Sequence, residues 1–473
     1  MDTDTIGSLF INSLKNCPNN CMVIDKGIKY TYEDIARYIA GFQLKFLEKM
    51  DIIPQIVAFK LDNSVEYIVT YFGLTLLGIV IQPIYSNSSN DEVEKLLSEC
   101  GTDTIICDRH ICVKNILNVV NFDELRCYSK KNKLIYSRVN PNDVGILLTS
   151  SGTTNNPKII AHSHFNMIKN CEMNVESICL KEGSLGLATL PLAFGYANMM
   201  TLLSHVYVCG GIVLYKELNF VPKVYSMLEK YQIFDFVAVP AILRGLTYFC
   251  QKKGKYICNN ELKKIFFGGG GITELEYKNF CNILTSDANL IQTYGCTECG
   301  PRISTKIIGE DYEACNLGKP IEGIEIKLFN PDKDGWGEIG IKTPTKMLGY
   351  IINGKLQAST GTYFYPGDIC KINNKGEIIF RARKGNIVKY LGFNISLEDI
   401  ESYVYRSVGG KYIVRAGVKD NDLFLDVQTL NMEIMEKINE VCMSLPMYKR
   451  PKVIKRVEKI EMTNNNKVKR VRY

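Results

Sequence analysis

The sequence lacks the features that would place the chain in a membrane or outside the cell. Its N-terminus has no basic region followed by an apolar core, so we expect no signal peptide. The 17 cysteines are an odd number without the spacing of a disulfide framework, and we expect reduced thiols in the cytoplasm. One apolar stretch, 67–85, is about long enough to span a bilayer, but Gly73, Gly78 and Pro83 interrupt it. We predict a buried helix, a turn at Gly78 and a short buried strand there, and no membrane span.

The sequence also offers little that would bind nucleic acid or a cluster of metal ions. The net charge is +7, and basic residues gather in 449–473 without alternating aromatic residues or a nucleic-acid motif. We interpret this tail as a solvated face that favours anionic ligands. Cys296 and Cys299 form a Cys-x-x-Cys pair, but the chain has no second Cys-x-x-Cys pair, so we interpret them as a coincidence. The four histidines form no ligand array and are expected to be structural: His110, His162, His164 and His205.

Length and patterning indicate an α/β protein of more than one domain. The 473 residues exceed the roughly 250–300 at which a single hydrophobic core stops growing. Apolar runs of strand length alternate with helical patterns, which predicts a large N-terminal domain, 1–382, with mixed, mostly parallel sheets. Within it, short alternating segments separated by turns predict a β-rich subdomain at 321–382. We place a small α+β domain at 383–473, joined through Gly385. Strands are expected near 56–61, 103–108, 145–150, 236–240 and 264–268, and helices near 91–100 and 222–231.

The segment 149–158, TSSGTTNNPK, has the composition of a phosphate-binding loop. It follows the apolar strand GILL directly, and its hydroxyls and backbone N–H groups can form one concave turn. A Walker loop needs Gly-Lys followed by Ser or Thr, whereas here Pro157 precedes the lysine and Ile159 follows it. The loop therefore differs from that of the usual P-loop enzymes. Its candidate phosphate ligands are Ser150, Ser151, Gly152, Thr153, Thr154 and Lys158.

Five further motifs follow in order along the chain. They read FGGGGIT at 267–273, YGCTE at 294–298, YPGD at 365–368, ARKGN at 382–386 with IVKYLGFNISLEDIE at 387–401, and TNNNKVKR at 463–470. Together with the loop at 149–158, the set resembles the adenylate-forming superfamily of acyl-CoA synthetases, peptide-synthetase adenylation domains and firefly luciferase. The resemblance covers about 31–470. It implies a mobile C-terminal domain that carries the catalytic lysine.

The resemblance assigns roles to individual residues of these motifs. The adenine would lie against the backbone of Gly269, Gly270 and Gly271 and stack on Tyr294. Thr297 would donate to the α-phosphate and Glu298 would hold Mg²⁺. Asp368 would accept hydrogen bonds from the ribose, and Arg383 would contact ribose or phosphate. Lys467 would be the catalytic lysine of adenylation, and Lys389 and Gly392 would serve the thiol-dependent step. The chain departs from the family pattern at five positions: Asn155, Ile159, Pro366, Gly385 and Asn466.

The implied activity is ATP-dependent activation of a carboxylic acid. The acid and ATP would give an acyl-adenylate and pyrophosphate, and the acyl group would pass to the phosphopantetheine thiol of coenzyme A, as in an acyl- or aryl-CoA ligase. Amino-acid-activating relatives place an Asp in the segment that corresponds to Phe194, Gly195 and Tyr196. No carboxylate stands there, so we expect a fatty, aryl or other uncharged acyl group.

Three alternatives remain open. A stand-alone enzyme could load an acyl or peptidyl carrier protein instead of coenzyme A, and the basic tail suits an acidic carrier. An inactive nucleotide-binding regulatory protein would belong to another class, although the chain keeps Glu298, Asp368, Arg383 and Lys467. A luciferase-type oxygenase would share the first step. Only the lack of a peroxisomal ending at 471–473 distinguishes the chain from such an oxygenase.

Overall fold

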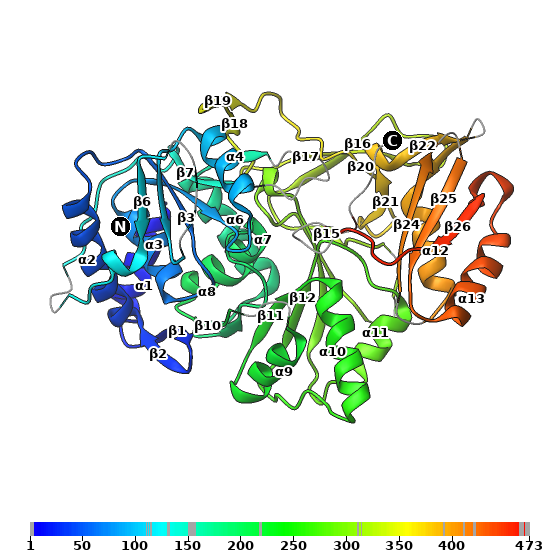
Figure 1. The fold of residues 1–473 in the computed structure, drawn as a ribbon, viewed down its shortest axis with the longest axis horizontal. Helices are drawn as coiled ribbons and strands as arrows, with labels where there is room; N and C mark the ends of the chain where they lie inside the picture. Colours follow the sequence, from blue (N-terminus) through cyan, green and yellow to red (C-terminus); the bar gives the residue numbers. More distant parts are fainter. Residues whose placement is uncertain are drawn as a thin grey trace.

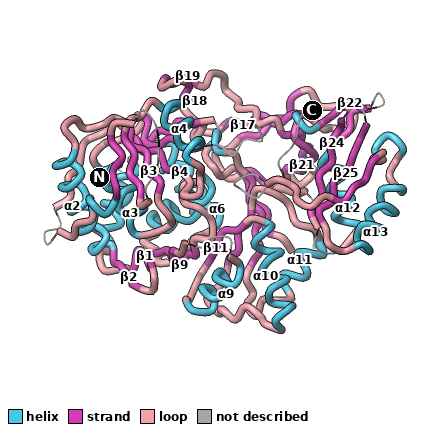
Figure 2. The backbone as a smooth tube through the Cα atoms, in the orientation of Figure 1, coloured by secondary structure: helices cyan, strands magenta, loops and turns pink. Residues whose placement is uncertain are grey.

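A computed structural model of the chain describes residues 4–109, 111, 113, 116–129, 133–149, 158–216, 220–309, 312–313, 315–390, 393–409, 412–419, 422–462 and 468. Figure 1 shows an N-terminal lobe of sheet and helices, a second lobe around α9–α11, and a C-terminal part that lies to one side. Strands and helices alternate through most of the chain (Figure 2), which confirms the predicted α/β class.

The first large sheet has nine strands, and its centre is parallel. The six central strands, β1, β10, β9, β11, β12 and β13, run parallel to one another. At one end β2 pairs antiparallel with β1, and at the other β14 pairs antiparallel with both β13 and β15. In sheet order the strands are β15 (Lys319–Pro320), β14 (Ser304–Ile307), β13 (Asn289–Tyr294), β12 (Lys264–Phe267), β11 (Asp235–Ala238), β9 (Leu185–Leu187), β10 (Gly211–Leu214), β1 (Cys21–Asp25) and β2 (Ile28–Thr31).

The second large sheet has eight strands and the same mixed character. Its parallel part runs from β7 through β4, β3 and β5 to β6, and the other strands are antiparallel. In sheet order the strands are β19 (Lys355–Ala358), β18 (Gly349–Ile352), β8 (Ile159–Ser163), β7 (Val144–Thr149), β4 (Val80–Ile84), β3 (Ile56–Lys60), β5 (Thr104–Cys107) and β6 (Asn118–Asn121).

Helices pack on both sheets, and the largest buried cluster joins them. It contains Val57 of β3, Ile146 of β7, Val237 of β11 and Phe266 of β12. A second cluster fills the space between the nine-stranded sheet and helices α9–α11. The helices of this region are α1 (Ile6–Asn16), α2 (Tyr32–Lys49), α3 (Val65–Leu76), α4 (Asn90–Cys100), α5 (Phe122–Leu125), α6 (His164–Ile178), α7 (Gly195–Ala197), the π-helix η1 (Asn198–Leu203), α8 (Ser204–Tyr207), α9 (Val221–Lys230), α10 (Pro240–Lys253), α11 (Glu274–Cys281) and the 3₁₀ turn η2 (Thr297–Cys299).

The apolar stretch 67–85 forms the predicted helix, turn and strand. Helix α3 begins after Ser64, whose side chain accepts a hydrogen bond from the backbone N–H of Tyr67. Gly78 adopts φ +78°, a left-handed turn conformation that glycine takes at little cost. Strand β4 then pairs in parallel with β3. Among the described residues, no helix is both long enough and apolar enough to cross a membrane.

The stretch 321–382 contributes strands to two different sheets. Four of its strands form an antiparallel sheet in the order β16 (Glu325–Phe329), β17 (Gly337–Lys342), β20 (Asp368–Ile372) and β21 (Ile378–Arg383). The hairpin β18–β19 instead extends the eight-stranded sheet, because Tyr350 of β18 pairs with Ile160 of β8. The chain therefore passes from the small sheet back to the large one before Asp368.

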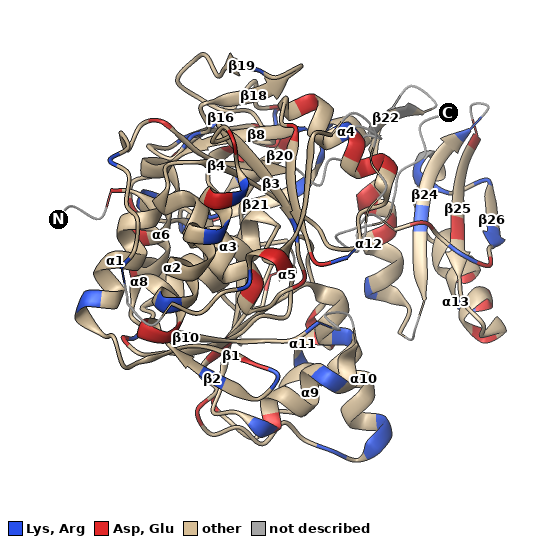
Figure 3. Cartoon of the chain, turned by 60° about the vertical axis from the view of Figure 1, so that its left-hand side comes forward, with Lys and Arg blue, Asp and Glu red and all other residues tan. Residues whose placement is uncertain are grey.

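The C-terminal part has a hydrophobic cluster of its own, formed by residues 390–445. Helices α12 (Leu397–Ser407) and α13 (Met432–Met443) accompany the sheet β24 (Ile413–Lys419), β25 (Asp422–Gln428) and β26 (Val453–Arg456). The 3₁₀ turns η3 (Lys384–Asn386) and η4 (Met447–Lys449) and the hairpin β22 (Ile387–Tyr390) and β23 (Phe393–Ser396) complete this part. Acidic residues stand in the first turn of α12 and basic residues on β26 (Figure 3).

Candidate functional site

The predicted motifs meet where strands of the two large sheets end. The glycine segment 268–271 follows β12, and the segment 295–298 follows the neighbouring strand β13. Strand β7 of the other sheet ends at Thr149 and is antiparallel to β8. Open α/β sheets bind ligands at the carboxyl ends of their parallel strands. The segments 268–271 and 295–298 both follow the carboxyl ends of parallel strands, so their position matches this rule.

The glycine segment presents bare backbone beside Thr293. A methyl group on Gly268 would lie 3.0 Å from Oγ1 and 3.1 Å from the carbonyl oxygen of Thr293, which is tighter than ordinary contact. Gly269, Gly270 and Gly271 are exposed, and a methyl group on Gly271 would meet no atom within 4 Å. The last glycines therefore offer an open edge against which a flat ring could lie, and the adenine contact of Gly269–Gly271 stays a prediction.

A hydrogen bond and an ion pair join Tyr294, Asp368 and Arg383 in one cluster. The Tyr294 hydroxyl donates to Oδ2 of Asp368 at 2.5 Å, and Nε of Arg383 lies 2.6 Å from Oδ1 of the same carboxylate. Asp368 and Arg383 face each other across strands β20 and β21. Asp368 is 1% exposed, whereas the Arg383 side chain is 44% exposed. Burial, and then the Asp368 carboxylate, raise the pKa of Tyr294 well above its ordinary value, so its hydroxyl remains a donor.

Two side chains that the sequence analysis did not assign to the site hold Thr297 and Glu298. Nε2 of His162, on β8, lies 2.7 Å from the carbonyl oxygen of Thr297. The hydroxyl of Tyr350, on β18, donates to Oε1 of Glu298 at 3.3 Å. Strands β8 and β18 are neighbours in the eight-stranded sheet, while Thr297 and Glu298 follow the nine-stranded sheet. Both contacts therefore cross from one sheet to the other.

The environment of Glu298 fits a magnesium ligand. Within the described part of the chain, no ion pair involves its carboxylate, and Tyr350 is a neutral donor to one of its oxygens. The backbone N–H of Met347 fixes the Glu298 carbonyl at 2.8 Å, which orients the residue. Carboxylate oxygens beside phosphates are the protein ligands that Mg²⁺ prefers. Glu298 is therefore held in place, and one of its two carboxylate oxygens is available to a metal ion.

His162 is neutral in this environment. Its side chain is fully buried, and burial lowers its pKa to about 4. Because Nε2 faces a carbonyl oxygen, Nε2 carries the proton and donates to Thr297. Nδ1 is buried without a hydrogen-bond partner among the described residues. A second proton there would be unpaired, which is why the charged form is disfavoured.

The predicted phosphate loop falls largely outside the described residues. Ser150, Ser151, Gly152, Thr153 and Thr154 belong to the part of the chain on which the structure gives no description. Lys158, at the end of the segment, is exposed, and its Nζ lies 4.9 Å from the ring centroid of Tyr350. Lys158 therefore stands next to the residue that holds Glu298.

The structure describes only some of the C-terminal residues to which the sequence analysis gave a role. Lys389 lies on strand β22, but its side chain, like Gly392 and Lys467, is outside the described residues. The predicted joint is described: Lys384 forms an ion pair with Glu338 of β17 at 2.7 Å, and Arg383 N–H groups also reach the carbonyl oxygen of Pro366 at 2.9 Å. The division at 383 stays a prediction.

The predicted substrate segment lies beside Thr297. A methyl group on Gly195 would be 3.4 Å from Cγ2 of Thr297. The Tyr196 hydroxyl lies 2.6 Å from Oγ1 of Thr293, and burial raises the pKa of Tyr196 to about 12. The Phe194 ring is 5.2 Å from the ring of Tyr85. The wall that these residues form is aromatic and neutral.

A buried arginine, Arg302, supports the backbone near the YGCTE motif. Arg302 is fully buried and donates to Oδ1 of Asn174, the carbonyl oxygen of Ser304 and Oγ1 of Thr305. Burial lowers its pKa to about 10. The turn before Arg302 leaves no space for a side chain at Gly295, because a methyl group there would lie 1.7 Å from the Pro301 carbonyl oxygen. The sequence signal was weak: a single Arg seven residues after the glycine of YGCTE.

Comparisons with known proteins agree with this geometry. The profile of the family described as AMP-binding enzyme matches residues 10–351. The chain is 25% identical over 386 residues to 4-coumarate–CoA ligase-like 6 of Arabidopsis thaliana, covering 73% of this chain and 67% of that protein. It is 23% identical over 471 residues to 2-succinylbenzoate–CoA ligase of Staphylococcus epidermidis, covering 96% and 94%. The structure of O-succinylbenzoate coenzyme A synthetase from Bacillus subtilis, in complex with ATP and magnesium ion, superimposes with a TM-score of 0.83 at 20% identity, covering 98% of both chains.

Proposed function

Because the chain belongs to the AMP-binding enzyme family, we propose that it activates an aryl or fatty carboxylic acid with ATP and passes the acyl group to coenzyme A. The observation that carries the proposal is the cluster of Tyr294, Asp368 and Arg383 beside the open glycine edge. A buried carboxylate with an arginine and an aromatic ring next to bare backbone suits a ribose and an adenine.

The first step joins two anions, so the protein has to position them and to balance their charge. The acid's carboxylate attacks the α-phosphorus of ATP, and pyrophosphate leaves. Thr297 would donate to the α-phosphate from a position that His162 fixes. Magnesium held at Glu298 would neutralise phosphate oxygens. The hydroxyls and N–H groups of the loop 150–154, with Lys158, would hold the leaving pyrophosphate.

Lys467 is the proposed bridge between the carboxylate and the α-phosphate. We expect Lys467→Ala to lower adenylation by about 10²–10³-fold, as for the loss of one oxyanion donor. A suitable control is Lys452→Ala, because Lys452 is an exposed lysine in the same C-terminal part whose ion pair, among the described residues, is with Asp422 at 2.8 Å. Equal pyrophosphate release by the two variants would remove Lys467 from the mechanism.

The aromatic wall supports an uncharged acyl group as the substrate. Phe194, Gly195 and Tyr196 bring no carboxylate to the position beside Thr297, so an α-ammonium group would have no counter-ion from this segment. By name, the relatives given above are a 4-coumarate–CoA ligase-like protein and a 2-succinylbenzoate–CoA ligase. We propose an aryl acid first and a fatty acid second.

Coenzyme A is the proposed thiol, and a carrier protein is the alternative. Both present the same phosphopantetheine group, for which Lys389 and Gly392 are the proposed contacts. We propose that the small C-terminal domain turns about Gly385 between the two half-reactions. Since the cysteines are scattered without framework spacing, we further propose that the protein works in the reducing cytoplasm.

The test follows the two half-reactions separately. The full chain is incubated with ATP, magnesium and a panel of aryl, fatty and amino acids, and acyl-AMP is identified by mass spectrometry. Coenzyme A or a phosphopantetheinylated carrier protein is then added, and the thioester is measured. Acyl-AMP without thioester from coenzyme A would favour the carrier, and a lack of acyl-AMP with every acid would refute the proposal.

A further inference from the structure

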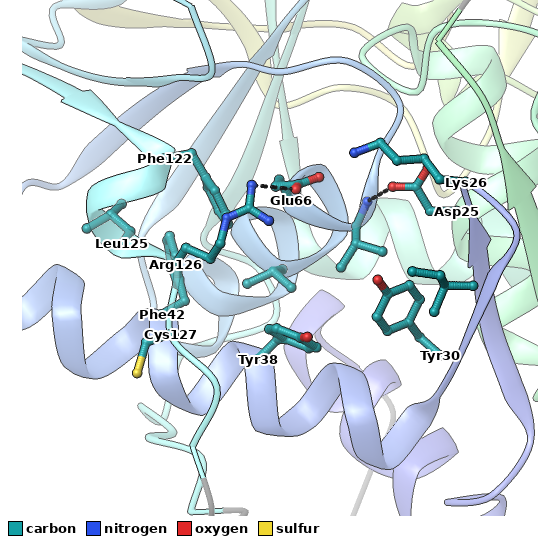
Figure 4. A pocket seen from close by; sticks show the side chains of 13 residues that line it. Asp25, Lys26, Tyr30, Tyr38, Phe42, Glu66, Phe122, Leu125, Arg126 and Cys127 are labelled. Atoms are coloured by element: carbon teal, nitrogen blue, oxygen red, sulfur yellow. Dashed lines mark hydrogen bonds and ion pairs between the residues drawn. The ribbon is translucent and has the colours of Figure 1, made fainter.

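A cavity far from the nucleotide motifs lies between the β1–β2 hairpin and helices α2, α3 and α5. Its volume is about 250 Å³, which is below the ~300–1,000 Å³ of pockets for drug-sized ligands. A single ring or a short chain would fill it. Figure 4 shows Tyr30 and Tyr38 on one side of the cavity and Asp25 and Glu66 on the other.

One side of the cavity is aromatic and aliphatic. The rings of Tyr30 and Tyr38 lie edge to face with their centroids 5.9 Å apart, and Phe42, Val69 and Phe122 are buried residues that also line the space. Aromatic faces attract organic cations through their quadrupoles. This wall therefore suits either an apolar ligand or an organic cation, and the charged residues of the cavity determine which of the two would bind.

The buried charges of the cavity are negative, and its positive charges are exposed. Asp25 is 5% exposed, and the Glu66 side chain is 13% exposed, whereas the Arg126 side chain paired with Glu66 at 2.8 Å is 54% exposed. Lys26 is also exposed. In the described part of the chain, no ion pair involves Asp25. Among the described residues, the backbone N–H of Val65 donates a hydrogen bond to the Asp25 carboxylate at 3.2 Å.

An anionic ligand would find no donor at the helix that begins here. Asp25 already accepts from the N–H of Val65, Ser64 accepts from that of Tyr67, and the Glu66 carboxylate accepts from its own backbone N–H. The first turn of α3 is therefore occupied, and two carboxylates would repel the anion. A neutral ligand would bury Asp25 further without pairing its charge, which is costly.

We propose that this cavity binds a small organic cation, an ammonium group on an aromatic or short aliphatic body, with the ammonium between Asp25 and the rings of Tyr30 and Tyr38. The ammonium would donate to the Asp25 carboxylate, and the body would pack on Phe42 and Phe122. Burial raises the pKa of Asp25, and a paired cation would relieve that cost. The site is independent of the adenylation proposal.

The test compares three probes that share a phenylethyl body and differ in charge, on the full chain by isothermal titration calorimetry. They are 2-phenylethylammonium, 2-phenylethanol and 2-phenylethanesulfonate, each with and without saturating ATP, and none of them is a carboxylic acid that the adenylation site could activate. The ammonium should bind, the other two should bind at least about 10-fold more weakly, and ATP should change nothing. Equal binding of the sulfonate, no binding of the ammonium, or displacement by ATP would each overturn the proposal.

Amino-acid substitutions test whether the ligand binds in this cavity. Asp25→Asn keeps an acceptor for the Val65 N–H and removes the charge, so the affinity for the ammonium should fall by about 10- to 100-fold. Glu48→Gln, at an exposed acid of α2, removes the same charge elsewhere and should change nothing. Tyr38→Leu should weaken binding by about 2- to 30-fold, which provides a second test if thermal unfolding shows that Asp25→Asn is not folded. Unchanged affinity in both folded variants would refute the assignment.

Discussion

Replacing His162 should make the protein less sensitive to acid. The folded chain rejects a second proton on this ring, because Nδ1 is buried without a partner among the described residues, and its pKa is about 4. The unfolded chain accepts that proton near pH 6.5. The unfolded state therefore binds more protons between pH 6.5 and 4, and stability must fall as the pH falls through that window and level off above it.

The two pKa values set the size of the effect. For a shift from about 6.5 to about 4, the free energy of unfolding loses roughly 2 kcal/mol at pH 5 and only about 0.2 kcal/mol at pH 7. Two variants separate titration from hydrogen bonding. His162→Gln can still donate to the Thr297 carbonyl and does not titrate. His162→Leu leaves that buried carbonyl without its donor, which costs about 1–3 kcal/mol at every pH.

The assay is urea unfolding at pH 7 and pH 5, followed by circular dichroism. We expect both variants to lose about 2 kcal/mol less than the unmodified chain between the two pH values, and His162→Leu to be the less stable variant at pH 7. His164, whose pKa burial also lowers to about 4, remains in all three proteins and contributes equally. If His162→Gln and the unmodified chain lost the same stability, the buried neutral ring would be refuted.

Three further variants test the site. Tyr350→Phe removes the donor to Glu298 and should weaken Mg·ATP binding about 2- to 10-fold by calorimetry, with unchanged binding contradicting its positioning role. Asp368→Asn places an amide against Nε of Arg383 and should weaken ATP binding about 10- to 100-fold, while wild-type affinity would place the ribose elsewhere. Gly295→Ala puts a methyl group 1.7 Å from the Pro301 carbonyl oxygen and should lower the unfolding temperature by several degrees, unlike Gly271→Ala, whose added methyl group meets no atom within 4 Å.

Local patterns predicted the elements well. Gly78 marked the end of α3 and the turn before strand β4, because the left-handed conformation of this glycine is set locally. Gly73 and Pro83, which were expected to interrupt the stretch as well, lie inside α3 and β4. The predicted strands 236–240 and 264–268 are β11 and β12, displaced by about one residue. The predicted helix 91–100 begins at Asn90, after the capping box of Ser89 with Glu92.

The sheet to which each strand belongs was not visible in the sequence. Alternation of polar and apolar residues identifies a strand but not its neighbour, so the hairpin β18–β19 was assigned to the β-rich subdomain, whereas it pairs with β8. That pairing is what brings Tyr350 to Glu298. The same holds for His162, which was expected to be an ordinary structural histidine and contacts Thr297, 135 residues away in the sequence.

The site itself was predictable where a motif is contiguous. Tyr294 ends β13, and Thr297 and Glu298 stand in the turn that follows. The hydrogen bond from Tyr294 to Asp368 and the ion pair of Asp368 with Arg383 bring the residues of the later motifs to Tyr294, while their contacts with the nucleotide stay predictions. Roles that depend on the loop 150–154 or on Lys467 stay predictions, because these residues lie outside the described part of the chain.

The most direct test of adenylation is carboxylate-dependent exchange of labelled pyrophosphate into ATP, measured without any thiol. The panel should contain aryl, fatty, β-amino and α-amino acids, and Asp368→Asn serves as the impaired control. We predict exchange with aryl or fatty acids and little with α-amino acids. Measurable ATP binding without exchange for any acid would contradict acid activation and would instead support a regulatory nucleotide-binding protein.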